Sequence, residues 1–175
     1  MNRKNINIII ILALAVVAIF IGLGFMGFGG LGNTTPTETS VGGVQAILNE
    51  IQSTGTVADL RVEEITLGTG DAVAVGDTLT VRYIGVLPDG TVFDSTDAHG
   101  GVPYTFTIGE GNVIQAWDMG LIGMKEGGRR LLAVPPALGY GAEPFGQIPA
   151  NATLIFDVEL LTRVPAGTPL PSPML

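Results

Sequence analysis

The feature that most constrains this chain is an uninterrupted apolar run from Ile8 to Leu31. The run holds 24 residues without a charged or polar side chain, and a helix of about 20 such residues spans a bilayer. Arg3 and Lys4 are the basic residues that flank it, and positively charged flanks stay on the cytoplasmic side. We therefore expect a cytoplasmic N-terminus at residues 1–7, a single transmembrane anchor in the apolar run, and the remaining chain on the extracytoplasmic side.

A cleaved signal peptide is the alternative for this segment, and cleavage would leave a secreted protein. Signal peptides usually carry an apolar region of about 7–15 residues that ends at a small-residue cleavage site. The run is longer than this and shows no clear A-x-A site. The sequence therefore favours an uncleaved, single-pass anchor.

Residues 32–55 are predicted to be a linker, because GNTTPTETSVGG is rich in Thr, Pro and Gly. Within them, Val44, Ile47, Leu48 and Ile51 follow the i, i+3, i+4, i+7 spacing of a short amphipathic helix. Such a helix either docks on the folded domain or lies at the membrane surface. The sequence alone leaves both alternatives open.

The charge balance argues against nucleic acid as a partner. Two of the eight basic residues precede the apolar run, so six basic and sixteen acidic residues remain beyond it. Arg129 and Arg130 form a basic doublet, but no basic stripe accompanies it. Binding to phosphate backbones depends on clustered positive charge, and binding to an anionic membrane surface has the same requirement.

The usual sets of catalytic and metal-binding residues are missing from the sequence. The chain has one histidine, His99, and no cysteine. A histidine-based metal cluster is therefore impossible, and a Ser-His-Asp triad has little support. No nucleotide-binding glycine loop or metalloprotease motif occurs in a suitable context. We expect no metal and no cofactor, and we expect His99 to be a solvated loop residue.

Residues 56–163 are predicted to form the folded domain, followed by a disordered, Pro-rich tail at residues 164–175. Six segments of the domain show apolar alternation or β-branched composition typical of strands. They are residues 60–67, 78–86, 91–95, 104–108, 129–134 and 153–161. Short strands of this kind, with turn residues between them, favour an antiparallel sheet.

One short helix interrupts these strands, in GEGNVIQAWDMGLIGM. Asn112 is a predicted N-cap with Gln115 at the capping-box position, and Gly123 is a natural end point. Ile114 and Trp117 share one helical face. The pattern predicts an α+β fold in which a five- to six-stranded antiparallel sheet wraps around this helix, with Trp117 facing the sheet.

Aromatic residues are spread over nearly every predicted element of the domain. They are Tyr83, Phe93, Tyr104, Phe106, Trp117, Tyr140, Phe145 and Phe156. An ordinary core draws mainly on Leu, Ile and Val, and aromatic residues with a polar group need hydrogen-bond partners. From the residues alone, these side chains form either a core or a convergent apolar pocket.

Four stretches resemble a known family: VRYIGVLPDGTVFDST, YTFTIGEGNVIQAWDMGLIGMKEGGRRLL, VPPALGYGAE and IPANATLIFDVELL. They are similar to the FKBP-type peptidyl-prolyl cis-trans isomerases, in the family's order and with nearly its spacing, over about residues 60–161. The resemblance implies an antiparallel sheet of five or six strands curled around a short helix, as the pattern also predicts.

The resemblance also implies the residues of a proline-binding pocket. Trp117 corresponds to the pocket floor, and Asp94 to a carboxylate at the pocket edge. The aromatic walls are expected to be Tyr83, Phe93, Tyr104 and Phe156. Val113 and Ile114 correspond to the helix entry, where the Ile114 N–H donates to a substrate carbonyl. The remaining contacts are expected from the hydroxyl of Tyr140 and from the apolar side chain of Ile148.

A pocket of this kind implies a prolyl isomerase that assists the folding of extracytoplasmic proteins, with Xaa-Pro segments as substrates. An apolar pocket that removes water from the bond favours the twisted, less polar amide over the planar one. It requires no metal, cofactor or covalent intermediate. The alternative is a binding module or chaperone that holds Pro-containing segments without turnover.

Two loops depart from the family pattern. The loop DAHGGV lacks the arginine that often pairs with the pocket carboxylate, and His99 is an approximate substitute. The orientation of Asp94 is therefore open, and macrolide ligands of the family are expected to bind with reduced affinity. The loop AEPFGQIP is about one residue shorter than in the family, which can alter substrate access.

Overall fold

The computed structural model describes residues 38–168 of the chain. Within this part, no helix is long and apolar enough to cross a membrane. The predicted cytoplasmic N-terminus and transmembrane anchor, residues 1–31, lie outside the described residues, and so does the end of the predicted tail, residues 169–175. These predictions stay predictions.

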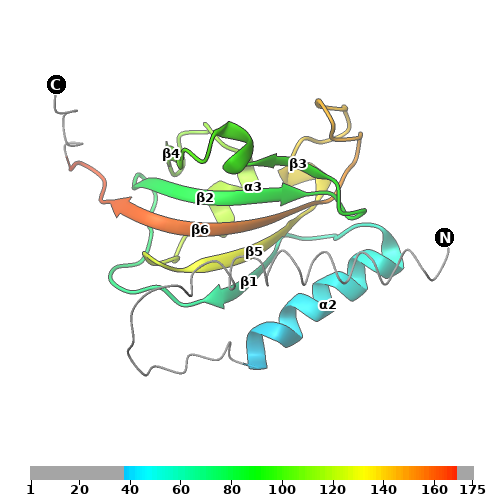
Figure 1. Ribbon diagram of the computed structural model, residues 1–175, viewed down its shortest axis with the longest axis horizontal. Helices are drawn as coiled ribbons and strands as arrows, with labels where there is room; N and C mark the ends of the chain where they lie inside the picture. Colours follow the sequence, from blue (N-terminus) through cyan, green and yellow to red (C-terminus); the bar gives the residue numbers. More distant parts are fainter. Residues whose placement is uncertain (1–37, 169–175) are drawn as a thin grey trace.

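Six strands form one antiparallel sheet (Figure 1). The strands are β1 (Arg61–Thr66), β2 (Thr78–Val86), β3 (Val92–Ser95), β4 (Tyr104–Thr107), β5 (Arg129–Val134) and β6 (Leu154–Val164). Their order is β1-β5-β6-β2-β3, and β4 pairs with the first half of β2 while β3 pairs with its second half. Each strand overlaps one of the six segments that the sequence predicts.

Each face of the sheet is covered by an apolar cluster. Side chains along a strand alternate between the two faces, so one strand contributes to both clusters. On β6, Phe156 and Val158 belong to the main core, which also holds Trp117. Ile155 points to the other face and joins a second apolar cluster. On β5, the alternation repeats with Leu132 in the main core and Leu131 in the second cluster. The central strands are therefore buried between two layers.

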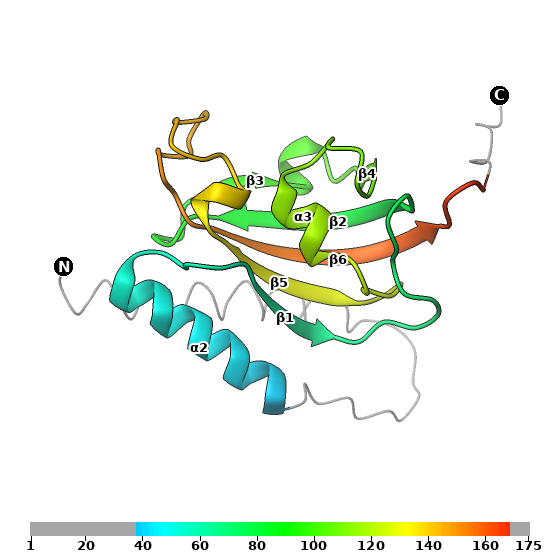
Figure 2. The same cartoon turned by 180° about the vertical axis from the view of Figure 1, so that it is seen from behind.

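The helix α3 (Gln115–Gly120) lies on the main core side of the sheet (Figure 2). The predicted N-cap at Asn112 is wrong. Ile114 is the N-cap residue, its backbone is extended, and no side chain caps the helix. Asn112 instead donates its side-chain amide to Glu110 Oε2 at 3.1 Å. The preceding loop is fixed from inside the helix, because Asp118 Oδ1 accepts the Gly109 N–H at 2.8 Å.

Close packing of α3 on the sheet depends on a glycine at its last turn. A Cβ atom at Gly120 would lie 2.6 Å from the Cδ2 atom of Leu132 on β5. The helix therefore approaches the strand more closely than any larger residue allows. This approach brings Trp117, one turn earlier, into the main core.

The second face is covered by α2 (Glu38–Thr54), the helix on the opposite side of the sheet from α3 (Figures 1 and 2). Ile47 and Ile51 are buried against Leu131, Ala133 and Ile155. The amphipathic helix that the sequence predicts thus docks on the folded domain. The predicted linker is corrected accordingly, because residues 38–54 form a helix of 17 residues that packs on the sheet.

The boundary of the predicted disordered tail is also corrected. Strand β6 continues to Val164, and the Ala166 N–H donates to Asp77 Oδ1 at 3.0 Å. Residues 164–168 therefore belong to the fold. Buried Asp77 holds them by combining this hydrogen bond with an ion pair to Arg163 on β6.

Candidate functional site

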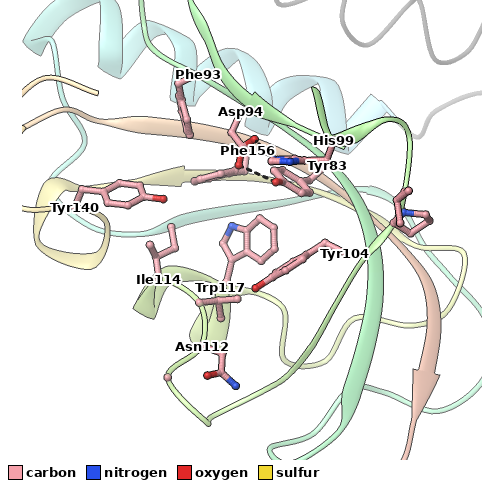
Figure 3. A pocket seen from close by; sticks show the side chains of 14 residues that line it. Tyr83, Phe93, Asp94, His99, Tyr104, Asn112, Ile114, Trp117, Tyr140 and Phe156 are labelled. Atoms are coloured by element: carbon pink, nitrogen blue, oxygen red, sulfur yellow. Dashed lines mark hydrogen bonds and ion pairs between the residues drawn. The ribbon is translucent and has the colours of Figure 1, made fainter. Parts of the chain in front are cut away.

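A cavity of about 700 Å³ opens between the sheet and α3 (Figure 3). Nine of the ten side chains that the resemblance assigns to the pocket line it: Tyr83, Phe93, Asp94, Tyr104, Val113, Ile114, Trp117, Tyr140 and Phe156. They come from β2, β3, β4, β6, α3 and the loops beside them. Tyr83 on β2 and Phe156 on β6 are more than 70 positions apart in the sequence. The antiparallel pairing of these two strands brings them together.

Trp117 lies at the centre of this cavity, with its indole surrounded by aromatic rings. Tyr83 and Phe156 meet it edge to face, with ring centroids at 5.2 and 5.4 Å. Phe106 packs from the core side at 5.4 Å. The indole is only 4% exposed and still lines the cavity, so it is part of the core and of the pocket at once. Its Nε1 is buried and has no hydrogen-bond partner among the described residues.

The Asp94 carboxylate at the pocket edge is fixed by three groups. The Tyr83 hydroxyl donates to Oδ2 at 2.7 Å, and the Ser95 N–H donates to Oδ1 at 2.8 Å. His99 Nε2 lies 2.8 Å from Oδ1. The orientation of Asp94, which the sequence left open, is therefore set by these three groups. His99 is also more than a solvated loop residue, because its ring lines the pocket beside Asp94.

Two tyrosines of the pocket have altered acidity. Burial raises the pKa of Tyr83, and the hydrogen bond to Asp94 and its negative charge raise it further. Burial also raises the pKa of Tyr140, with a smaller contribution from the charge of Asp94. Both hydroxyls therefore stay protonated at neutral pH and can act as hydrogen-bond donors.

Two donors at the pocket have no acceptor within the described residues. The Ile114 N–H precedes the first turn of α3 and makes no hydrogen bond there. The Tyr140 hydroxyl points into the cavity from the loop after the 3₁₀ turn η2 (Pro136–Leu138) (Figure 3). Groups of this kind can bind carbonyl oxygens of an extended peptide.

Ile148 is the one predicted site residue that does not line the cavity. It is 4% exposed and belongs to the main core. Phe145 and Ile148 exchange two backbone hydrogen bonds of 2.9 Å, and this tight turn directs Ile148 inward. Phe145 is instead 61% exposed and stacks on Tyr140, with ring centroids 4.8 Å apart.

Sequence reasoning missed several lining residues: Val102, Pro103, Gly111 and Asn112. They lie in the loops before β4 and before α3. Their positions beside Tyr104 and Val113 in the sequence were the available signal. Loop residues carry no periodic pattern, so only their neighbourhood could have indicated them.

The lining of the site is suited to binding, because most of its side chains are apolar or aromatic. Its lining side chains include no serine, cysteine, lysine or threonine nucleophile. No three His, Asp or Glu residues gather as a metal-binding group anywhere in residues 38–168. The arrangement offers an aromatic surface with hydrogen-bond donors at its edge.

The comparisons with known proteins agree with this geometry. The sequence profile of the FKBP-type peptidyl-prolyl cis-trans isomerases matches residues 70–161. The chain belongs to this family. Within the solved structures, the FKBP domain is similar to the crystal structure of AtFKBP13, with a TM-score of 0.56 and 35% identity, over 60% of this chain and 93% of that one.

Fungal FKBP proteins are similar over the same region. FK506-binding protein 4 of Chaetomium thermophilum is 47% identical over 105 residues, which are 60% of this chain and 21% of that protein. FK506-binding protein 4 of Aspergillus oryzae is 45% identical over 115 residues, which are 63% and 24% of the two chains. The chain thus spans less than a quarter of the length of these relatives.

Proposed function

We propose that this chain is a peptidyl-prolyl cis-trans isomerase that acts on Xaa-Pro segments. The observation that carries the proposal is the cavity with the indole of Trp117 at its centre and the donors of Ile114 and Tyr140 at its edge. A proline ring fits such an aromatic surface, and the donors are placed to hold the carbonyl groups beside it. Membership of the FKBP family supports the same activity.

The reaction needs no nucleophile, because the bond to be rotated is not broken. Rotation of an amide meets a barrier of about 18–20 kcal/mol, since resonance is lost when the bond is twisted. The twisted amide is less polar than the planar one, so a pocket that removes water favours the transition state. The donors hold one side of the bond while the other rotates. Each 1.4 kcal/mol of differential stabilisation accelerates exchange about tenfold.

The test is the exchange rate of an Xaa-Pro peptide, measured by NMR with the full-length protein in detergent micelles. We expect cis-trans exchange to accelerate in proportion to protein concentration. Tyr140→Phe keeps the stacking on Phe145 but removes the pocket hydroxyl, and it is expected to lower kcat/KM. Met119→Leu is the matched control, because Met119 is exposed on α3 and does not line the cavity. If peptides bind and exchange remains unchanged, the domain is a binding module.

We further propose that the isomerase is tethered to a membrane, with its FKBP domain on the extracytoplasmic side, where it assists protein folding. The support is the apolar run at residues 8–31 and the basic residues before it. Fractionation is expected to find the full-length chain in membranes, and protease added outside is expected to digest the domain. A shortened, freely soluble form with a new N-terminus near Gly30 would show a cleaved signal instead.

FK506-type macrolides are proposed as a second ligand class, because the fungal relatives are named as FK506-binding proteins. We expect weaker binding than is usual in the family, since His99 stands where an arginine often pairs with the carboxylate. His99→Arg is then expected to tighten binding in a titration. Because Tyr83 and Ser95 also fix Asp94, equal affinity before and after the change would show that these two groups suffice.

A further inference from the structure

The loop between η2 and β6 carries a stacked pair of aromatic rings beside the cavity. Tyr140 lines the cavity, and its hydroxyl points inward (Figure 3). Phe145 does not line the cavity. Its ring stacks on that of Tyr140, with centroids 4.8 Å apart and an angle of 10° between the ring planes. Because Phe145 is 61% exposed, it adds little to the apolar burial that stabilises the fold. The stack therefore calls for an explanation other than core packing.

The side chain of Tyr140 has few restraints apart from this stack. Glycine stands on both sides of it in the sequence. Within residues 38–168, its hydroxyl makes no hydrogen bond, and Phe145 supplies its one ring contact. Tyr83 differs in both respects, because its ring packs on the main core and its hydroxyl donates to Asp94. The stack is therefore the contact that restrains the direction of the Tyr140 phenol.

Phe145 is itself anchored by a tight turn. It exchanges two backbone hydrogen bonds of 2.9 Å with Ile148, and Ile148 is buried in the main core. Gly146, which follows Phe145, has a φ of 56°. A two-residue hairpin turn requires a positive φ at this first position, which favours glycine there. The backbone of Phe145 is therefore tied to the core, and its ring offers Tyr140 a fixed surface.

We propose that Phe145 is a positioning residue of the isomerase, whose ring holds the Tyr140 phenol so that the hydroxyl stays directed into the cavity. The proposal rests on the proposed isomerase function, in which this hydroxyl donates to a carbonyl oxygen beside the proline. A donor that is oriented before the substrate arrives loses less side-chain freedom on binding. It also meets the carbonyl oxygen in the transition state without rearrangement. Phe145 thus acts through Tyr140 and needs no contact with the substrate.

The test is a double-mutant cycle with the full-length protein in detergent micelles, in which NMR measures cis-trans exchange of an Xaa-Pro peptide. Phe145→Ala removes the stack and is expected to lower kcat/KM about three- to tenfold, the cost of ordering one free side chain. Tyr140→Phe removes the hydroxyl that the stack orients. In the Tyr140→Phe background, Phe145→Ala is therefore expected to lower kcat/KM by less than about 1.5-fold, because residues that act as a unit are not additive.

Rescue and control variants separate positioning from a general effect on the fold. Phe145→Tyr keeps a flat ring for the stack and is expected to retain at least about half of the wild-type kcat/KM. Leu67→Ala is the matched control, because Leu67 is also an exposed apolar residue, follows β1 and lies outside the cavity. It is expected to change nothing. The cycle is repeated with Phe145→Gln, which suits an exposed position and has no ring, so that the result does not depend on one variant folding.

The outcomes distinguish this inference from the proposed function. An equal loss from Phe145→Ala in the wild-type and Tyr140→Phe backgrounds overturns the inference, because Phe145 then acts without Tyr140. Unchanged kcat/KM in Phe145→Ala overturns it as well, and both results leave the isomerase function intact. If the wild-type protein accelerates no exchange, the isomerase function fails. The dissociation constants of the peptide for the same four proteins then decide the inference: non-additive changes support it, and additive changes overturn it.

Discussion

The Tyr83 hydroxyl donates a hydrogen bond of 2.7 Å to the Asp94 carboxylate and joins an aromatic wall of the pocket to its charged edge. The two residues lie on the neighbouring strands β2 and β3, where Asp94 pairs with Gly85. The lack of a side chain at Gly85 matters here, because a Cβ atom would lie 2.6 Å from the ring of Phe93. The phenol and the carboxylate are therefore placed by strand register and by close packing.

Tyr83→Phe is predicted to keep the pocket wall and to loosen the carboxylate. The ring still packs on Trp117, but Asp94 retains only the Ser95 N–H and His99 as partners. Losing a hydrogen bond to a charged group costs about 1.5–3 kcal/mol, part of which is expected as weaker ligand binding. Titration calorimetry with a macrolide ligand measures the change. Unchanged affinity would show that the bond serves the fold alone.

The same variant is predicted to change the alkaline titration of the protein. The pKa of Tyr83 is raised by burial and by Asp94, so its phenol ionises above the value of about 10 for free tyrosine. The protonated phenol makes its full contribution to the stability of the fold below a pH of about 10, the pKa of tyrosine in the unfolded chain. This contribution is lost as the pH rises above that value. In a pH titration followed by absorbance at 295 nm, Tyr83→Phe is expected to lose the phenol ionisation that occurs at the highest pH. Denaturant midpoints are expected to fall less steeply above pH 10 in the variant.

Trp117 is predicted to report ligand binding, because it is the only tryptophan of the chain and lines the cavity. A Pro-containing ligand that packs on the indole changes its fluorescence saturably. Trp117→Leu is expected to destabilise the fold by less than the roughly 3–5 kcal/mol of a change to alanine, since leucine refills part of the space. Its affinity is expected to fall even where the protein is folded. A folded variant with unchanged affinity and isomerase rate would remove Trp117 from the site.

Local alternation explains why the six strands were predictable from the sequence. In β6, the alternation of Phe156 and Val158 with polar neighbours indicates a face directed toward a core. Because side chains along a strand alternate between its two faces, the strand also fixes the direction of its aromatic side chains. The resemblance to the FKBP family then assigned the residues that alternation cannot bring together, such as Tyr83 and Tyr140.

The predictions that were wrong concern residues whose positions depend on contacts that the local sequence pattern does not show. Ile148 is apolar and close to the pocket in sequence, but the turn that it forms with Phe145 directs it into the core. Asn112 has the chemistry of an N-cap, but Glu110 accepts its amide instead. The start of the disordered tail was predicted too early in the sequence, at residue 164. The hydrogen bond from the Ala166 N–H to Asp77, which holds this segment, spans 89 positions of sequence. No local pattern records such partners.

Asp77→Asn is predicted to destabilise the fold at neutral pH. Burial alone raises the pKa of Asp77, but hydrogen bonds from the Ala74 N–H, the Arg163 guanidinium and the Ala166 N–H outweigh it and hold this pKa below 3.8. The contribution to stability is therefore complete above the unfolded value of about 3.9 and is lost as the pH falls below it. Removing one partner of a buried pair costs about 3–5 kcal/mol. In denaturant titrations, the gap between wild type and variant is expected to narrow from pH 5 toward pH 2; a constant gap would assign the loss to packing.

The last prediction concerns α2, which covers the face of the sheet opposite the pocket (Figure 2). Ile47→Ala is expected to lower the free energy of unfolding by about 2–5 kcal/mol, as for other large-to-small changes in a core, because Ile47 is buried against the second apolar cluster. Isomerase activity of the folded protein is expected to stay unchanged, since the sheet separates this cluster from Trp117. Gln45→Ala, on an exposed position of the same helix, is the control and is expected to alter neither quantity. Chemical denaturation gives the stability, and NMR exchange gives the activity. A loss of activity without a loss of stability would mean that α2 acts on the pocket through the sheet.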